Sequence, residues 1–295
     1  MTDTKYVSSL IPWRNKIEKI TFSRVLLYIF MITLVAFTSL PLIYVLCTAF
    51  KPLNELFIYP PRFFVQNPTL KNFSDLLISL GSSTVPFTRY VFNSLLITVA
   101  TVFFSIVICS MGAYGLAKHR PVGSNVIFSI ILAALMFSSH VTQIPRYMVV
   151  NSLQLIDTYA ALILPGIASA YNFFLMKQFI EQFPTELMEA ARIDGAGEFK
   201  IFWGILMPSI KPAWSTLVML TFVSSWNDYF SPLIFTTRQE MKTLPLALQT
   251  ISGGNIGRMG ATSAATLLMT IPTILVFMVM QKRVMTTMVH SGIKA

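Results

Sequence analysis

Charge and cysteine are both scarce in this chain. Only 12% of its 295 residues are charged, 54% are hydrophobic, and mean hydropathy is +0.66. The two cysteines, Cys47 and Cys109, lie in separate hydrophobic runs without the spacing of a metal or redox motif. The histidines are also isolated: His119, His140 and His290. We therefore expect no metal site.

Catalytic motifs are missing as well. The chain has no GxxxxGK[ST] phosphate loop, and no nucleophile–base pattern is visible. We therefore expect no enzymatic activity and no cofactor bound by this chain. Its net charge of +10 comes without a basic face interleaved with aromatic residues. Nucleic acid is not an expected partner, because basic residues that flank membrane helices explain the charge better.

The hydrophobic residues are gathered into long uncharged runs. About 20 apolar residues cross the ~30 Å hydrocarbon core of a bilayer as a helix, and a helix satisfies its own backbone groups there. The first run is too long for a signal peptide. The sequence predicts an all-α, polytopic membrane protein with six transmembrane helices at about 25–50, 90–117, 122–145, 158–176, 212–237 and 259–281.

The distribution of basic residues predicts the orientation. With six spans, 14 of the 22 Lys and Arg residues fall on the side that carries both termini. The positive-inside bias places that side in the cytoplasm. We therefore expect a cytoplasmic tail at 1–24, one transmembrane domain at 25–281 and a cytoplasmic tail at 282–295, in a bacterial cytoplasmic membrane.

A charged segment interrupts the hydrophobic runs between the fourth and fifth spans. Eight charged side chains fall between Lys177 and Lys200. Pro184 suits the first turn of a helix, and Asp194-Gly195 suits its end. A second amphipathic turn with Phe199, Phe202, Trp203 and Leu206 on one side follows, and Met207-Pro208 is expected to break it. This is either an ordinary wet loop or a helix–turn–helix on the cytoplasmic surface.

The residues of this segment favour the second interpretation. "EAARIDGA" followed by "FWGILMP" resembles the EAA loop of permease subunits of binding-protein-dependent ABC importers. The positions that match are Glu189, Ala190, Ala191, Asp194, Gly195 and Pro208. The residue before the proline is methionine, where the family usually has leucine. "NSLLITVATVFFSIVICSMGAYGLAKHR", "TYAALILPGIASAYNFFLMKQF", "SSWNDYFSPLIF" and the ending "SGIKA" resemble the carbohydrate-uptake branch, the maltose-type second permease.

The resemblance implies an import machine that this chain forms in part. The EAA loop would be a coupling helix seated in a separate ATPase, with Glu189 pairing with a basic residue there. The partners implied are a second homologous permease, two copies of the ATPase, an extracytoplasmic solute-binding protein and membrane lipid. ATP would be used by the ATPase. The expected function is transport of a sugar or oligosaccharide, with another solute as the alternative.

A single carboxylate falls inside the fifth hydrophobic run. Asp228 follows Asn227, and an ionisable residue within a membrane span is a functional-site hypothesis by default. Either it lies at the external interface in water, or the pair lines the translocation path. An ion-gradient-driven transporter would show several such residues or broken inverted repeats, and a membrane-embedded enzyme would show clustered polar residues. Both are less favoured here.

Overall fold

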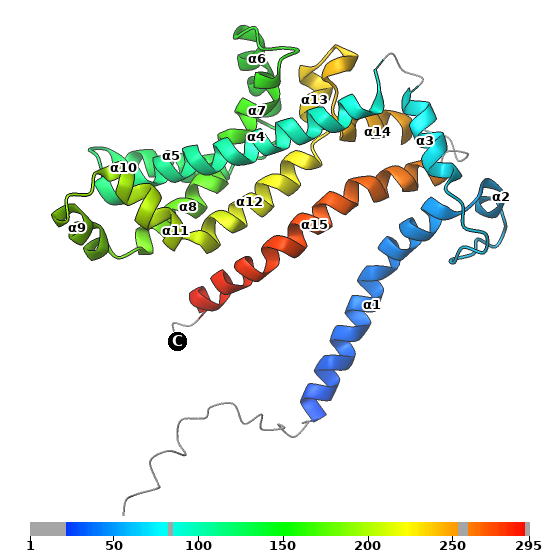
Figure 1. Cartoon of the computed structure of the whole chain (residues 1–295), viewed down its shortest axis with the longest axis horizontal. Coiled ribbons are helices and arrows are strands. Elements are labelled where there is room, and N and C mark those ends of the chain that lie inside the picture. The colour runs from blue at the N-terminus through cyan, green and yellow to red at the C-terminus, as the bar shows by residue number, and fades with distance from the viewer. Residues whose placement is uncertain (1–21, 82–84, 253–258, 293–295) are drawn as a thin grey trace, which may run out of the picture. The chain divides into compact units, whose positions relative to one another are not determined.

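The computed structural model describes residues 22–81, 85–252 and 259–292, and in these ranges the regular structure is helical throughout (Figure 1). Most of the predicted tail at 1–24 and the last three residues lie outside them. The chain divides into two compact units, Met1–Tyr44 and Val45–Ala295. Helix α1 (Phe22–Phe50) is apolar and begins in the first unit, where its described residues up to Tyr44 are almost wholly exposed.

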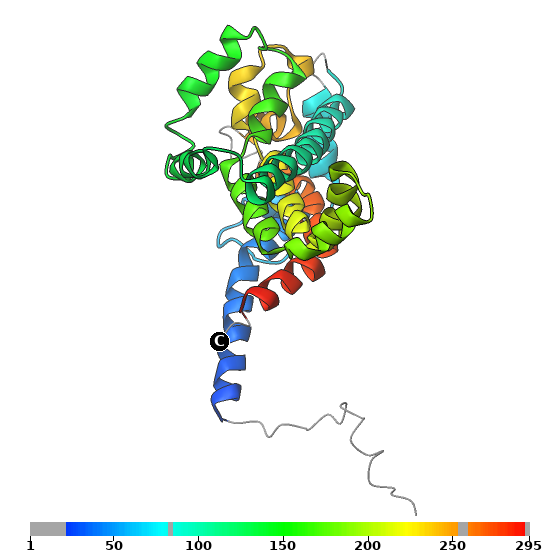
Figure 2. The ribbon, with the colours of Figure 1, turned by 90° about the vertical axis from the view of Figure 1, so that its left-hand side faces the viewer.

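The second unit is built on long apolar helices that pack along one another. Helix α4 (Phe87–Tyr114) contacts α7 (Tyr159–Ile167), α8 (Ala170–Gln182) and α12 (Lys211–Trp226). Helix α12 in turn packs against α15 (Met259–Gly292), which also contacts α3 (Lys71–Gly81) (Figures 1 and 2). Three clusters of buried apolar side chains hold these contacts.

Short helices occupy both ends of this bundle. At one end lie α9 (Thr185–Ile193), α10 (Glu198–Ile201), a wide π-turn at Phe202–Leu206 and α11 (Met207–Ser209) (Figure 1). Helix α4 also ends in a π-turn, Gly115–His119, before α5 (Ser124–Leu135). The remaining short elements are α2 (Leu53–Leu56), α6 (Gln143–Ser152), α13 (Phe230–Phe235), a 3-10 turn (Gln239–Met241) and α14 (Leu244–Ser252).

Among the described residues, three helices are long and apolar enough to cross a membrane: Phe22–Phe50, Phe87–His119 and Met259–Gln281. Two bent pairs raise the number to five if each is one span. The first, Tyr159–Ile167 with Ala170–Gln182, bends by 43°, and the second, Glu198–Ser209 with Lys211–Trp226, bends by 79°.

Three of the predicted runs are not single helices. In 158–176, α7 ends at Ile167 and α8 starts at Ala170. In 122–145 the helix ends at Leu135, and α6 starts at Gln143 with Pro145 in its first turn, where proline is well tolerated. In 212–237 the helix ends at Trp226, before Asn227-Asp228. These predictions relied on long runs with little or no charge, yet Ser, His, Asn and proline redirect a backbone without adding net charge.

Candidate functional site

The charged segment folds as a helix, a glycine turn and a second helix. Glu186 lies in the first turn of α9, where a carboxylate is favourable to the helix dipole. At the other end Gly195 has φ +79°, its N–H donates to the carbonyl of Arg192, and the N–H of Ala196 donates to the carbonyl of Ala191. This pair of bonds is a Schellman motif, which needs a left-handed residue at the glycine position. The predicted helix end at Asp194-Gly195 is therefore correct.

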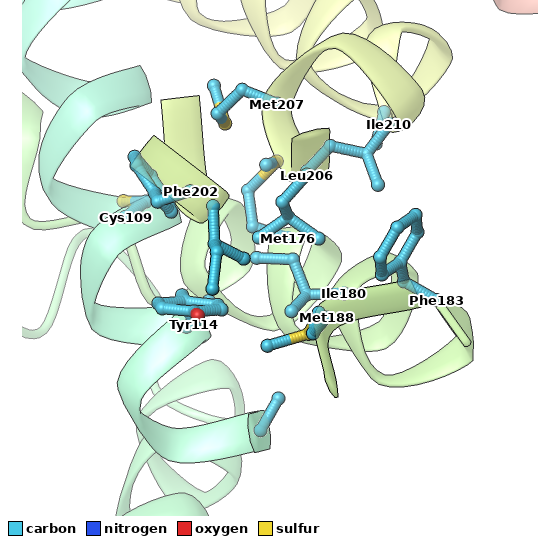
Figure 3. Close-up of a cluster of buried hydrophobic side chains, with 14 of the residues drawn as sticks. Cys109, Tyr114, Met176, Ile180, Phe183, Met188, Phe202, Leu206, Met207 and Ile210 are labelled. Carbon is cyan, nitrogen blue, oxygen red and sulfur yellow. The ribbon is translucent and has the colours of Figure 1, made fainter. Parts of the chain in front are cut away.

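The inner face of α9 is fixed by apolar packing. Met188 is fully buried and Ala191 nearly so, in a cluster with Ile180 of α8, Ile201 of α10 and Leu206 of the π-turn (Figure 3). Burial of one such large side chain stabilises by about 1.5–3 kcal/mol. This face holds the short helix against the end of the bundle, although a nine-residue helix is only marginally stable on its own.

A polar joint centred on Glu198 ties the same elements together. One carboxylate oxygen, Oε1, accepts a hydrogen bond from Nε of Arg192 at 2.8 Å. The other, Oε2, accepts one from the Tyr114 hydroxyl at 2.6 Å and lies 3.4 Å from Nε2 of His119. The hydrogen bond to Glu198 raises the pKa of Arg192 above its ordinary value. Glu198 thus joins the end of α4, the end of α9 and the start of α10.

The outer face of α9 remains open. Glu189 and Ala190 are exposed, as are Asp194 and Gly195 at its end. The apolar side chains of Leu187 and Ile193 are 53% and 87% exposed. Of the six predicted positions, Ala191 alone is buried, and Pro208 lies exposed in α11, away from this face along the chain.

The second turn departs from the sequence prediction in two ways. Phe202 and Leu206 are buried, but Phe199 is 74% exposed and Trp203 is 38% exposed, so the four do not share one face. Met207 is helical (φ −59°, ψ −41°), so the helix is not broken at Met207-Pro208. Its N–H reaches back five residues to the carbonyl of Phe202, and this wider turn accommodates the proline. The chain turns only at Ile210.

Asn227 and Asp228 lie at the break between α12 and α13. The Asp228 carboxylate accepts hydrogen bonds from the N–H groups of Phe230 and Ser231, at 3.0 and 3.1 Å, and so caps α13. Asp228 also lines a small polar cavity of about 20 Å³ with hydroxyl-bearing residues that include Ser94 and Thr243. The Asn227 side chain is exposed and donates to the carbonyl of Val223 within its own helix.

Comparison with known proteins gives the family. A model described as "Binding-protein-dependent transport system inner membrane component" matches residues 105–289. The chain belongs to this family. It is 32% identical, over 92% of this chain and 96% of the relative, to the arabinooligosaccharides transport system permease protein AraQ of Bacillus subtilis (strain 168). This family makes it a membrane-spanning permease subunit that works with an ATPase and a binding protein, and not an enzyme.

Further relatives share the permease description. The lactose transport system permease protein LacG of Rhizobium radiobacter is 31% identical over 68% of this chain and 73% of the relative. The sn-glycerol-3-phosphate transport system permease protein UgpE of Yersinia enterocolitica is 34% identical over 69% and 73%. A solved bacterial ABC transporter that imports the acidic polysaccharide alginate contains a chain with the same fold. The TM-score is 0.77 and the identity 24%, over 89% of this permease and 98% of that chain.

Sequence reasoning missed two buried asparagines that join the helices of this permease. Asn93 in α4 accepts from the Tyr159 hydroxyl and donates to the carbonyls of Glu240 and Lys242 at 2.7 and 2.9 Å. Asn172 in α8 donates to the hydroxyls of Ser105 and Thr221 at 3.0 and 2.9 Å. A single amide inside an uncharged run was the available signal, because polar side chains in membrane helices usually bond to a neighbouring helix.

An aspartate clamp holds the segment that follows α13. Asp157 Oδ1 accepts from the N–H groups of Thr237 and Arg238, at 2.6 and 2.9 Å, and Oδ2 accepts from the Thr237 hydroxyl. These bonds, from the Arg238 N–H first, hold the pKa of Asp157 below its ordinary value. Within the described ranges no three His, Cys, Asp or Glu side chains gather as a metal ion would require.

Proposed function

We propose that this permease forms half of the translocation pathway of an ATP-driven importer for a sugar or oligosaccharide. We place six spans in the membrane, with both termini and the α9 turn in the cytoplasm, because this arrangement puts most of the basic residues on the cytoplasmic side. The other half would be a second homologous permease, and two copies of an ATPase would bind the ATP. The names of AraQ and LacG support a saccharide. The name of UgpE keeps a phosphorylated polyol as the alternative solute.

The coupling site that we propose is the outer face of α9 with the Gly195 turn. One observation carries this proposal: the inner face is held by buried packing and by Glu198, whereas Glu189, Ala190 and Ile193 are exposed together on a short rigid helix. Small and apolar residues permit close approach of a partner surface, and Glu189 offers an ion pair at its edge. The ATPase pair would then move the helix as a rigid body and switch the permease between inward- and outward-facing states.

For Asn227 and Asp228 we propose a place beside the translocation path. Their position at a break between two helices resembles the irregular backbone that lines cavities in membrane proteins. The Asp228→Asn variant tests this, because an amide keeps one capping oxygen and removes the charge. Lower uptake with an unchanged amount of assembled transporter supports a role at the path. Unchanged uptake and substrate affinity would leave Asp228 as a helix cap alone.

Affinity purification from the native membrane tests the main proposal. The wild-type chain should bring down an ATPase and a second permease. When the binding protein loaded with a saccharide is added, the purified complex should hydrolyse ATP faster. Gly195→Asp should lose the ATPase but keep the second permease. Gly197→Asp is the control, since Gly197 lies in the same turn at φ −71° with open space around it. A wild-type chain that purifies alone would overturn the coupling site.

A further inference from the structure

A polar pocket lies away from the coupling face, between the end of the Gly115–His119 turn, the start of α5 and the side of α8. It measures about 340 Å³. Its polar and aromatic lining consists of Arg120, Ser124, Asn125, Phe128, Lys177 and Glu181. The proposed coupling and translocation roles use none of these residues.

The pocket carries an excess of positive charge. Nζ of Lys177 lies 2.8 Å from Oε2 of Glu181 and 3.8 Å from the centre of the Phe128 ring, so its position is fixed. Arg120 is exposed. Its Nε donates a hydrogen bond to the carbonyl of Ala117 at 3.4 Å. Lys118 lies behind, with Nζ 3.4 Å from the Glu181 carbonyl. The pocket lining therefore holds two cations, Arg120 and Lys177, against one carboxylate, Glu181.

The start of α5 adds to this potential. Its cap, Gly123, is left-handed (φ +85°) and has no side chain to accept from the helix start. The Ser124 N–H donates to the Pro121 carbonyl at 2.9 Å, which leaves the N–H groups of Asn125 and Val126 to face an anion. The hydroxyl of Ser124 and the amide of Asn125 lie in the same lining. Together with the two cations these groups match a phosphate, which accepts hydrogen bonds and carries negative charge.

An exposed apolar stripe begins beside the pocket. Val122 is fully exposed, Val126 is 63% and Ile130 is 64% exposed. Val126 and Ile130 are four residues apart and share one face of α5, and Val122 lies in the turn just before this helix. A helix of 12 residues is about 18 Å long, which is comparable to an acyl chain. The pocket and the stripe together offer an anionic head site and an apolar tail site.

We propose that this pocket binds an anionic phospholipid, with the phosphate at Arg120 and Lys177 and one acyl chain along Val122, Val126 and Ile130. Basic pockets between membrane helices on the cytoplasmic side are suited to such headgroups. The proposal rests on the proposed function only in placing the pocket in the cytoplasmic leaflet. The lipid would fix the angle between α5 and α8, next to the joint that carries α9.

The test uses the purified transporter in detergent, titrated with phosphatidylglycerol or phosphatidylcholine. Thermal stability and the amount of lipid retained after washing are measured. Phosphatidylglycerol should stabilise the wild type and phosphatidylcholine should not. Arg120→Gln should weaken the phosphatidylglycerol response roughly fivefold, the effect of one basic residue near an anionic surface. Lys177→Arg, which keeps the charge, should respond like the wild type, and Lys177→Gln should not.

Arg238→Gln is the matched control, because it removes an exposed arginine from a distant segment. An equal loss in Arg120→Gln and Arg238→Gln would overturn the site, as would an unchanged response in Arg120→Gln. Inorganic phosphate is titrated in parallel. If it reproduces the Arg120-dependent shift while phosphatidylglycerol has no effect, the ligand is a soluble anion and the lipid assignment is wrong. These readouts need neither the ATPase nor the solute, so they are independent of the proposed transport function.

Discussion

Nε of Arg192 lies 2.8 Å from Oε1 of Glu198, across the turn that Gly195 makes. The ion pair joins α9 to α10, and the second oxygen of Glu198 extends the joint to Tyr114 of α4. The turn is therefore braced from within rather than held by backbone bonds alone. Glu198 therefore connects α9 with the end of α4.

The joint predicts a ranking of two variants. Glu198→Gln should lower the melting temperature of the purified transporter more than Arg192→Gln. Glu198 contacts three side chains, whereas Arg192→Gln removes one of these three contacts. Both side chains are partly exposed, so the shifts should be small, roughly 1–3 °C. The double variant should equal Glu198→Gln within error. Additive shifts would show that the two residues act separately.

Gly195 should matter more to transport than Glu189. Gly195→Asp adds a side chain and a negative charge beside Asp194, on the exposed turn proposed to meet the ATPase, at a φ of +79° that glycine adopts most readily. Glu189→Ala removes one exposed contact. Uptake should be abolished in the first and reduced in the second. Gly195→Asn, which tolerates the left-handed conformation without charge, should be intermediate, and Gly197→Asp should transport normally. Equal uptake in Gly195→Asp and Glu189→Ala contradicts this ranking.

The Asp157 clamp predicts a pH dependence confined to acid. Its folded pKa lies below the ordinary 3.8, so its contribution is complete above that pH and is lost as pH falls through the lower folded value. Hydrogen exchange of the Thr237 and Arg238 amides should become roughly tenfold faster in Asp157→Asn at neutral pH, since bonds to a charged acceptor are the stronger ones. Residue 157 has a left-handed backbone (φ +60°), which asparagine tolerates as aspartate does. The substitution therefore removes the charge without straining the backbone. Exchange that is equal in both proteins at neutral pH would exclude the clamp.

Asn172 should stabilise the bundle through its amide. Asn172→Leu removes the donor to Ser105 and Thr221 and should cost about 1–3 kcal/mol, given two interhelical bonds in a membrane. Ser110→Ala is the control, because the buried Ser110 hydroxyl has no hydrogen-bond partner among the described residues. It should be neutral or slightly stabilising. Thermal unfolding in one lipid mixture measures both, and equal losses would refute the role of Asn172.

The sequence predicted the α9 turn well because its chemistry is local. A left-handed glycine after a short helix leaves few alternatives, and the end at Asp194-Gly195 is where the structure has it. Pro184 precedes the helix instead of lying in its first turn, a difference of one residue at a fraying end. The sequence did not distinguish the aromatic residue that is buried after the turn from the one that is exposed. Phe199 and Phe202 have the same character, and a π-turn that the sequence does not announce changes which of them faces the bundle.

The spans were predicted less well because length and lack of charge do not specify a straight helix. In 122–145 the polar Ser138, Ser139 and His140 lie where the structure turns between α5 and α6. The polar joints depend on partners far along the chain. Asn93 meets residues nearly 150 positions away, at Glu240 and Lys242. No local pattern indicates such a pairing.

The π-turn at Phe202–Leu206 has a consequence for how this segment tolerates changes in length. It holds one residue more than an α-turn, and each helical residue rotates the chain by about 100°. Deleting a residue there would restore α-helical spacing and swing everything before it, Glu198 included, around the axis. Most substitutions would leave that orientation intact. The direction in which α9 points thus depends on the number of residues in this turn. Single-residue deletions should therefore be far more damaging here than point substitutions.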